Sequence, residues 1–233
     1  MSHKSALSPE QIYSVSPTLA TYTKTLISDD MWNRPILSKH DRAMITVAAL
    51  IARQQTMGMK HYFNLAMDLG VSAKEMSEVV LHMAFYAGWS NAFAAVDILK
   101  DIFAERGISP DQLPTLEPEM LPMSQALPDN DFFMGLIDQN IRSFVPKLAD
   151  NSTDVLYHQV WLRPDLNPRD RNLISVTALI AQGLYDFVTV YSLRAKAVGI
   201  SKEEMQELLA HLAFYAGTPY IVPAIPHVAK AYE

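Results

Sequence analysis

The chain has 233 residues and no cysteine, which excludes disulfide bonds, thiolate metal ligands and thiol-based redox chemistry. Its net charge of −6 argues against nucleic acid as the main partner, because phosphate binding needs a surplus of lysine and arginine. The first residues lack the apolar stretch of a secretory signal and no apolar run could span a bilayer, so we expect a cytoplasmic protein that does not enter membranes.

The first strongly marked helix in chain order begins after Ser38. Serine is typical of the residue that caps a helix N-terminus, and Asp41 follows three residues later, where a carboxylate can bond exposed amides. Ala43–Ala52 is apolar on nearly every side, which predicts a central helix that is buried all round. A second helix is predicted to end near Gly70.

The next predicted helix runs from a capping box to a glycine stop. Ser72 and Glu75 have the spacing of a capping box, and Gly88 is typical of a helix C-terminus. A further helix is predicted at about Asn91–Arg106. Five prolines follow within residues 107–130, so this segment is predicted to be an extended linker.

The same pattern then returns, shifted by 129 residues. Ser16–Phe103 aligns with Val145–Tyr232 without a gap, and 29 of the 88 aligned pairs are identical. An internal repeat of this strength predicts a tandem duplication of one all-α unit. We therefore predict one repeat at 1–106, the proline-rich linker at 107–130 and a second repeat at 131–233.

The second copy repeats the helix signals with small changes. Asn167 takes the N-cap position, and Pro168 suits the first helical turn. A second capping box spans 201–204, and Gly217 is the equivalent stop. Three prolines predict that the last helix of this copy is short or broken, namely Pro219, Pro223 and Pro226.

Three segments recur in both copies: Trp-x-Arg-Pro-x-Leu-x-x-x-Asp-Arg, an apolar Ala-Leu-Ile-Ala helix, and His-x-Ala-Phe-Tyr-Ala-Gly. Together they resemble the carboxymuconolactone decarboxylase family, which shares the alkylhydroperoxidase D-like helical fold. The resemblance covers almost the whole chain, once per copy. It implies a homo-oligomer: because single-unit members form rings of six, a fused pair is expected to form a homotrimer with a pseudo-sixfold arrangement.

The chain departs from that family at one helix. The peroxidase branch carries Cys-x-x-Cys-x-x-x-His at a fixed distance before a Gly-Val-Ser segment. The corresponding residues here are Gln55, Gly58 and Tyr62 in the first copy and Leu184, Phe187 and Tyr191 in the second. The missing thiols exclude dithiol peroxidase chemistry. The decarboxylase branch usually keeps the histidine, whereas tyrosine, with a pKa near 10, is a poor proton shuttle at neutral pH.

Two histidine–tyrosine pairs are the main candidates for catalysis. His82 and Tyr86 lie four residues apart and share a helix face, as do His211 and Tyr215. One interpretation is a pocket in which the histidine acts as general acid or base near neutral pH. The other is a buried histidine that fixes how helices dock.

Arginine and tryptophan side chains are candidates for substrate binding. Arg42 and Arg171 each follow an aspartate in the first turn of a helix, where the helix dipole disfavours a cation. Each is predicted to bind either an interface carboxylate or a substrate carboxylate. Trp32 and Arg34 could hold an anionic substrate by stacking and bidentate contact, or could serve as a structural staple or subunit contact.

The first hypothesis is a carboxy-lyase, without cofactor or metal, that acts on a small anionic lactone or keto acid. Arg42 or Arg34 would hold the anion and His82 would supply the proton. Trp89 with Phe85 would form an apolar wall that discourages a hydrated carboxylate. Tyr62 would complete the substrate-binding residues of the first copy. Because Thr218 stands at the Trp89 position, the first copy is expected to be active and the second structural.

The second hypothesis is a non-catalytic small-molecule binder or assembly protein that kept the fold and lost the chemistry. The histidine missing from both copies motivates it. Glu78 and Glu207 precede the two repeat histidines by one turn, but a metal site there would need a third ligand that the repeat does not supply.

Overall fold

The computed structural model describes residues 7–233, and over this range the chain consists of helices without strands, which confirms the all-α prediction. No helix in this range is both long and apolar enough to cross a bilayer. The first copy contains α1 (Pro9–Tyr13), α2 (Pro17–Tyr22), α3 (Lys39–Ala52), α4 (Thr56–Asp68), α5 (Ala73–Ala87) and α6 (Trp89–Glu105). The rest of the chain contains α7 (Met123–Ala126), α8 (Asn130–Ile137), α9 (Pro146–Asp150), α10 (Pro168–Gln182), α11 (Tyr185–Ala197), α12 (Lys202–Ala216), α13 (Thr218–Ile221) and α14 (Ala224–Ala231).

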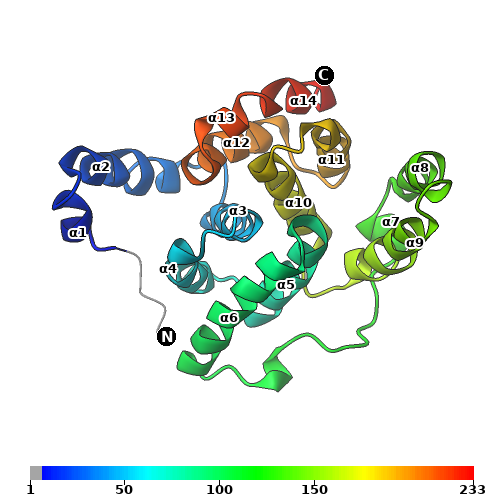
Figure 1. The fold of residues 1–233 in the computed structure, drawn as a ribbon, viewed down its shortest axis with the longest axis horizontal. Coiled ribbons are helices and arrows are strands. Elements are labelled where there is room, and N and C mark those ends of the chain that lie inside the picture. The colour runs from blue at the N-terminus through cyan, green and yellow to red at the C-terminus, as the bar shows by residue number, and fades with distance from the viewer. Residues whose placement is uncertain (1–6) are drawn as a thin grey trace.

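Helices α3 and α10 pack against each other at the centre of the molecule (Figure 1). They are the equivalent helices of the two copies. Every residue of 41–52 and of 170–181 is buried, which confirms the burial predicted for Ala43–Ala52 and extends it to Asp41, Arg42 and their equivalents. The two copies therefore share one core.

The helices that carry the repeat histidines cross between the copies. Helix α5 of the first copy packs on α10 of the second, and α12 of the second copy packs on α3 of the first. Each histidine is thereby placed against the central helix of the other copy.

The helix ends follow the predicted signals. Ser72 Oγ accepts from the amide of Glu75 at 3.2 Å, and the Glu75 carboxylate accepts from the amide of Ser72 at 2.7 Å. The helix stops at Gly88 and Gly217 have φ of +93° and +94°, a region that favours glycine. As the prolines predict, the last helix of the second copy is broken into α13 and α14.

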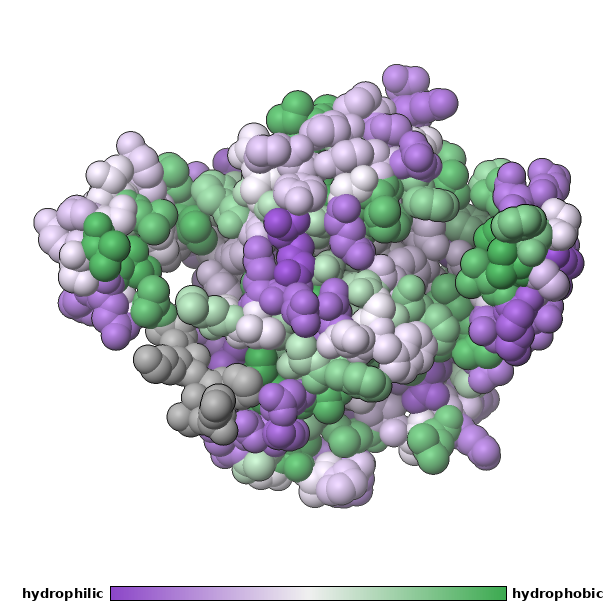
Figure 2. All heavy atoms as spheres, in the orientation of Figure 1, coloured by the Kyte–Doolittle hydropathy of each residue, from purple (hydrophilic) through white to green (hydrophobic). Residues whose placement is uncertain are grey.

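Two arms extend from the core on opposite sides (Figure 1). The first arm consists of α1, α2 and a π-helical turn at Thr23–Ser28, and the second of α8, α9 and π-helical turns at Asp138–Arg142 and Asn151–Tyr157. Each arm ends in a short 3₁₀ turn that carries the repeat tryptophan, at Met31–Asn33 and Val160–Leu162. Figure 2 shows hydrophobic side chains exposed on both arms.

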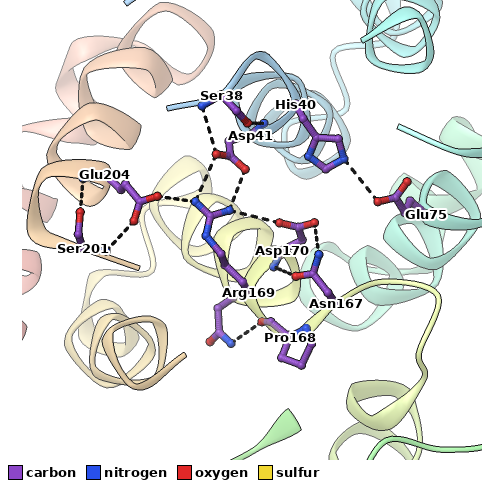
Figure 3. Close-up of polar contacts among 11 residues, drawn as sticks. Ser38, His40, Asp41, Glu75, Asn167, Pro168, Arg169, Asp170, Ser201 and Glu204 are labelled. Carbon is purple, nitrogen blue, oxygen red and sulfur yellow. Dashed lines mark hydrogen bonds and ion pairs between the residues drawn. The ribbon is translucent and has the colours of Figure 1, made fainter. Parts of the chain in front are cut away.

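Charged side chains join the two copies where the N-termini of α3 and α10 meet (Figure 3). Arg169 donates to the two oxygens of Asp41 at 2.8 and 3.2 Å and to Glu204 at 2.7 Å. Asp41 belongs to the first copy and Arg169 to the second, so this ion pair ties the copies together.

Three possible metal ligands gather at the same junction. One ligand atom each from His40, Asp41 and Asp170 lies within 4.8 Å of the others. Both Asp41 oxygens accept from Arg169, and Asp170 accepts from Asn167 at 2.7 Å. Arg169 therefore already pairs with both carboxylates, at 2.8 Å from Asp41 and 3.5 Å from Asp170.

His40 is expected to make the stability of the fold depend on pH. Its hydrogen bond with Glu75, together with the attraction of Asp170, raises the pKa of His40 above its usual value. Because the pKa is raised in the folded state, protonation of His40 stabilises the fold. This stabilisation is complete at pH values below the unfolded-state pKa and is lost as the pH rises through the folded-state pKa. The melting temperature lost in His40→Gln should therefore be larger at about pH 6 than at about pH 9.

A second variant controls for the loss of the ring. His40→Arg places at this position the residue type that Arg169 supplies in the second copy, and arginine stays charged throughout that range. His40→Arg should therefore change the melting temperature by the same amount at both pH values. An equal loss of melting temperature at both pH values in His40→Gln would show that the charge of His40 does not act on stability.

Candidate functional site

The two repeat histidines have equivalent partners. His211 Nε2 lies 2.9 Å from Thr46 Oγ1, and His82 Nε2 lies 2.7 Å from Ser175 Oγ. Each hydroxyl already donates to a backbone carbonyl one turn earlier in its helix, at 2.9 Å for Thr46 and 2.8 Å for Ser175. Since a hydroxyl has one proton, each can only accept from the imidazole, so Nε2 carries the ring proton. Nδ1 of both histidines is buried without a partner among residues 7–233.

Both histidines are neutral at physiological pH. Burial and the nearby charge of Arg42 lower the pKa of His211 to about 3. Burial, with Arg171 and Arg194 adding repulsion, lowers the pKa of His82 well below its usual value. The expectation of a histidine that titrates near neutral pH is therefore wrong for both, because neither ring is exposed to water.

Trp32, Tyr62, His211 and Tyr215 form one group, the Tyr215 cluster, to which both copies contribute. Trp32 Nε1 donates to the Tyr215 hydroxyl at 2.8 Å. The ring of Tyr62 meets that of Tyr215 edge-on, with centroids 5.3 Å apart, and stacks with Trp32 at 6.4 Å. Tyr62, which stands where the family's histidine is missing, is thus placed beside Tyr215. The Tyr215 oxygen accepts from Trp32, and the hydroxyl also has a hydrogen bond with Tyr62 that raises its pKa.

An open cavity of about 1510 Å³ lies beside the Tyr215 cluster. Trp32, Tyr62 and Tyr215 line it, together with residues of the first arm, while His211 is fully buried behind them. Burial raises the pKa of Tyr215, so its phenol stays protonated. Lys39, the first residue of α3, also lines the cavity. The cavity therefore combines phenols and apolar surface with charged side chains of both signs, Lys24 and Lys39 beside Glu10 and Asp29.

His82, Tyr86, Trp161 and Tyr191 form the equivalent group, the Tyr86 cluster. Trp161 Nε1 donates to the Tyr86 hydroxyl at 3.1 Å. The Tyr86 and Tyr191 hydroxyls are 3.0 Å apart, and that of Tyr157 lies 2.9 Å from Tyr191. The same tryptophan-to-tyrosine hydrogen bond occurs in the Tyr215 cluster. Here the tryptophan comes from the second copy and the tyrosine from the first, whereas there the reverse holds.

Side chains fill the space beside the Tyr86 cluster. Arg194 is fully buried, and its guanidinium carbon lies 3.3 Å from the centre of the Phe133 ring and 5.1 Å from that of Tyr157. In the first copy the positions of Arg194 and Tyr157 are taken by Leu65 and Ser28, which both line the open cavity. Because the side chains at these two positions are smaller there, the Tyr215 cluster faces an open cavity.

Three of the predicted site arginines bind carboxylates of the protein. Arg42 and Arg34 both donate to Glu207, at 2.8 and 2.7 Å, and Arg171 donates to Glu78 at 2.7 Å. The predicted grouping of Arg42 or Arg34 with His82 is therefore wrong, because both lie at Glu207, one turn before His211 on α12. Their guanidinium groups are used to join the copies.

The predicted apolar wall lies away from the open cavity. Phe85 and Trp89 contact each other with ring centroids 5.0 Å apart, at the junction of α5 and α6. Trp89 is 51% exposed, and neither residue is among those that line the cavity. The aromatic surface of the cavity comes instead from Trp32 and Tyr62.

Several residues at the two clusters were not predicted from sequence. Thr46 and Ser175 fix the histidine tautomers, and Arg194 and Tyr157 fill the Tyr86 cluster. Comparison of the copies position by position could have indicated the last two. Arg194 and Tyr157 stand where the first copy has the smaller Leu65 and Ser28. They lie close in sequence to Tyr191 and Trp161, which are the same residue types in both copies.

Comparison with known proteins matches one family to each copy of the repeat. The model of the carboxymuconolactone decarboxylase family matches residues 17–101 and again 146–230. A 4-carboxymuconolactone decarboxylase of Acinetobacter baylyi is 30% identical over 84 residues, which cover 36% of this chain and 63% of that protein. A nitrosuccinic acid decarboxylase of Metarhizium robertsii is 29% identical over 73 residues, which cover 31% of this chain and 51% of that protein.

The chain thus spans between about half and just under two thirds of the length of these two relatives. The family match, by contrast, covers most of the chain and falls once on each copy of the internal repeat. The chain belongs to the carboxymuconolactone decarboxylase family.

Proposed function

We propose that the protein is a carboxy-lyase that removes carbon dioxide from a small organic acid bound in the cavity beside the Tyr215 cluster. The observation that carries this proposal is the Tyr215 hydroxyl. It is held in place by Trp32 at 2.8 Å, it is kept protonated by burial, and it lines an open cavity. This places a neutral acid next to a space that a substrate can enter.

The reaction would need groups of this chain and water. The bond between the carboxylate carbon and the rest of the substrate breaks, carbon dioxide leaves, and the electron pair stays on the substrate. Tyrosine is a poor shuttle between weak acids and bases, but the carbanion is a far stronger base than a phenolate. Tyr215 therefore donates its proton to the carbanion, and water returns a proton to the phenolate. Apolar walls such as Leu50 and Leu65 favour loss of the carboxylate charge.

Lys39 is the residue that would attract the substrate anion. Arg42 and Arg34 are held by Glu207, and Lys24, which also lines the cavity, binds Asp29 at 2.6 Å. Lys39→Met is therefore expected to raise KM more than it lowers kcat, because the lysine acts on the bound carboxylate and not on the proton transfer. Steady-state kinetics would measure this; an unchanged KM would remove Lys39 from the proposal.

The names of the two relatives suggest which acids to test. A lactone and a nitro group can each take up the electron pair left when carbon dioxide departs. We therefore propose 4-carboxymuconolactone and nitrosuccinic acid as the first substrates. The test is loss of the substrate's ultraviolet absorbance together with release of carbon dioxide by the purified protein. Absence of both reactions, with intact fold, would overturn the proposed activity on these acids.

The second candidate is a binding protein without catalysis. The observation that favours it is Tyr62, which stands where the decarboxylase branch usually has a histidine. Thermal stabilisation by the same acids without release of carbon dioxide would support it. Turnover that depends on Tyr215 would exclude it.

We further propose that three chains assemble into a ring. Association between chains is supported by exposed apolar side chains on both arms, such as Leu19 and Tyr22 on one and Phe144 and Leu148 on the other. Light scattering of the purified protein should give the mass of three chains. The mass of a single chain would contradict this prediction.

A further inference from the structure

We propose that the substrate acid of the cavity beside the Tyr215 cluster carries a long apolar chain or ring in addition to its carboxylate. This inference rests on the proposed function and names the part of the substrate that does not react. Four large apolar side chains that are exposed in this chain line the same cavity: Leu7, Tyr13, Met57 and Phe214. Exposed apolar side chains that gather at one place mark a binding surface, because contact between apolar surface and water is unfavourable until something covers it.

The volume of the cavity exceeds what an acid without such a group would fill. At about 1510 Å³ it is larger than most pockets for drug-sized ligands, which measure about 300–1000 Å³. The first arm contributes apolar residues to one side of it, such as Pro9, Ile12 and Ile27. A compact acid placed against Tyr215 would leave that side in contact with water. An apolar group on the acid would cover it.

The charged side chains at the cavity give the acid a direction. Lys39, on α3, places a positive charge on the core side, to which Tyr215 also belongs. Glu10, on α1, places a negative charge on the side of the first arm. Lys24 and Asp29 pair with each other at 2.6 Å, so their charges balance. A carboxylate is therefore favoured on the core side and disfavoured beside the arm, which leaves the arm to the uncharged part of the substrate.

The second copy supplies an internal comparison. Three residues that line the cavity, Ser28, Gly58 and Leu65, stand where the second copy has tyrosine, phenylalanine and arginine. Packing does not require the glycine: a Cβ added at Gly58 would lie 3.5 Å from Leu50 and 3.6 Å from Tyr62, which are ordinary contacts. The small residues of the first copy thus keep free a space that larger residues could occupy.

Calorimetric titration with saturated straight-chain acids, from butanoate to octanoate at constant ionic strength, tests the inference without any measurement of activity. These acids have no group that can take up the electron pair left by carbon dioxide, so they bind without being consumed. Each methylene that enters the cavity should tighten binding by about threefold to fourfold. Equal affinities for butanoate and octanoate would overturn the inference, and would indicate that a second chain, and not a ligand, covers these side chains.

Met57→Glu and Phe187→Glu form a matched pair of variants. Both replace an exposed apolar side chain by a carboxylate, but Met57 lines the cavity, whereas Phe187 lies on α11 and is not among the lining residues. Met57 is 73% exposed, so the fold should tolerate its replacement. Met57→Glu should weaken octanoate binding by about tenfold, and Phe187→Glu should leave it unchanged. Equal effects of the two variants would show that the acids bind elsewhere.

The inference and the proposed reaction can fail separately. Release of carbon dioxide from 4-carboxymuconolactone or nitrosuccinic acid, together with equal affinities for butanoate and octanoate, would overturn the inference and leave the reaction standing. Affinity that rises with chain length, without release of carbon dioxide from any acid, would support the apolar binding site and overturn the reaction.

Discussion

Replacement of Tyr215 by phenylalanine is expected to lower kcat by about 10²–10⁴-fold, the usual contribution of a positioned proton donor. The variant keeps the ring that packs against Tyr62 and His211 and loses only the hydroxyl that accepts from Trp32. KM should change little, because the substrate anion is attracted by Lys39. Steady-state rates of carbon dioxide release would measure both parameters.

Tyr220→Phe is the control for this experiment. Tyr220 lies on α13 of the same copy, and the guanidinium of Arg53 stacks on its ring. It is not among the residues that line the open cavity. It should retain the rate of the wild-type protein. A Tyr215→Phe variant as active as wild type would mean that the proton comes from another group, and the proposed reaction would lose its donor.

The second large effect is expected on stability, at Glu78. This carboxylate accepts from Arg171 at 2.7 Å and from Arg163 at 2.6 Å, and its side chain is 1% exposed. Glu78→Gln would leave Arg171, which is fully buried, without a counter-charge. Removing one partner of a buried ion pair costs about 3–5 kcal/mol, so the free energy of unfolding should fall by that amount.

Denaturant unfolding would measure this loss, and an exposed pair provides the comparison. Lys24 and Asp29 lie 2.6 Å apart with side chains 73% and 53% exposed, so Asp29→Asn should barely change the unfolding midpoint. Similar losses in Glu78→Gln and Asp29→Asn would show that burial of the arginine is not what makes the first pair important.

The fold could be predicted from sequence because its signals are local and occur twice. The N-cap at Ser38, the capping box at Ser72 and the stop at Gly88 each act within one turn of a helix. The repeat at a spacing of 129 residues supplied an independent second reading of every element. The all-round apolar character of α3 and α10 was enough to place both at the centre.

The sites could not be predicted as well, because they depend on which copy each helix packs against. A sequence read one copy at a time groups His82 with Arg42, but the crossing of α5 onto α10 places His82 at Ser175 instead. The equivalent crossing of α12 onto α3 brings Tyr215 to Tyr62. The pKa values were missed for the same reason, since burial between two copies cannot be read from a helix alone.

The sharing of both clusters between copies has a consequence for how such a protein can change. In a symmetric pair of identical single units, any substitution appears in both sites at once. Fusion into one chain removes that constraint, so Leu65 in the first copy can coexist with Arg194 at the equivalent position of the second. A duplicated gene of this kind can therefore retain one site while it adapts the other to a different ligand, without ever having to encode a second protein.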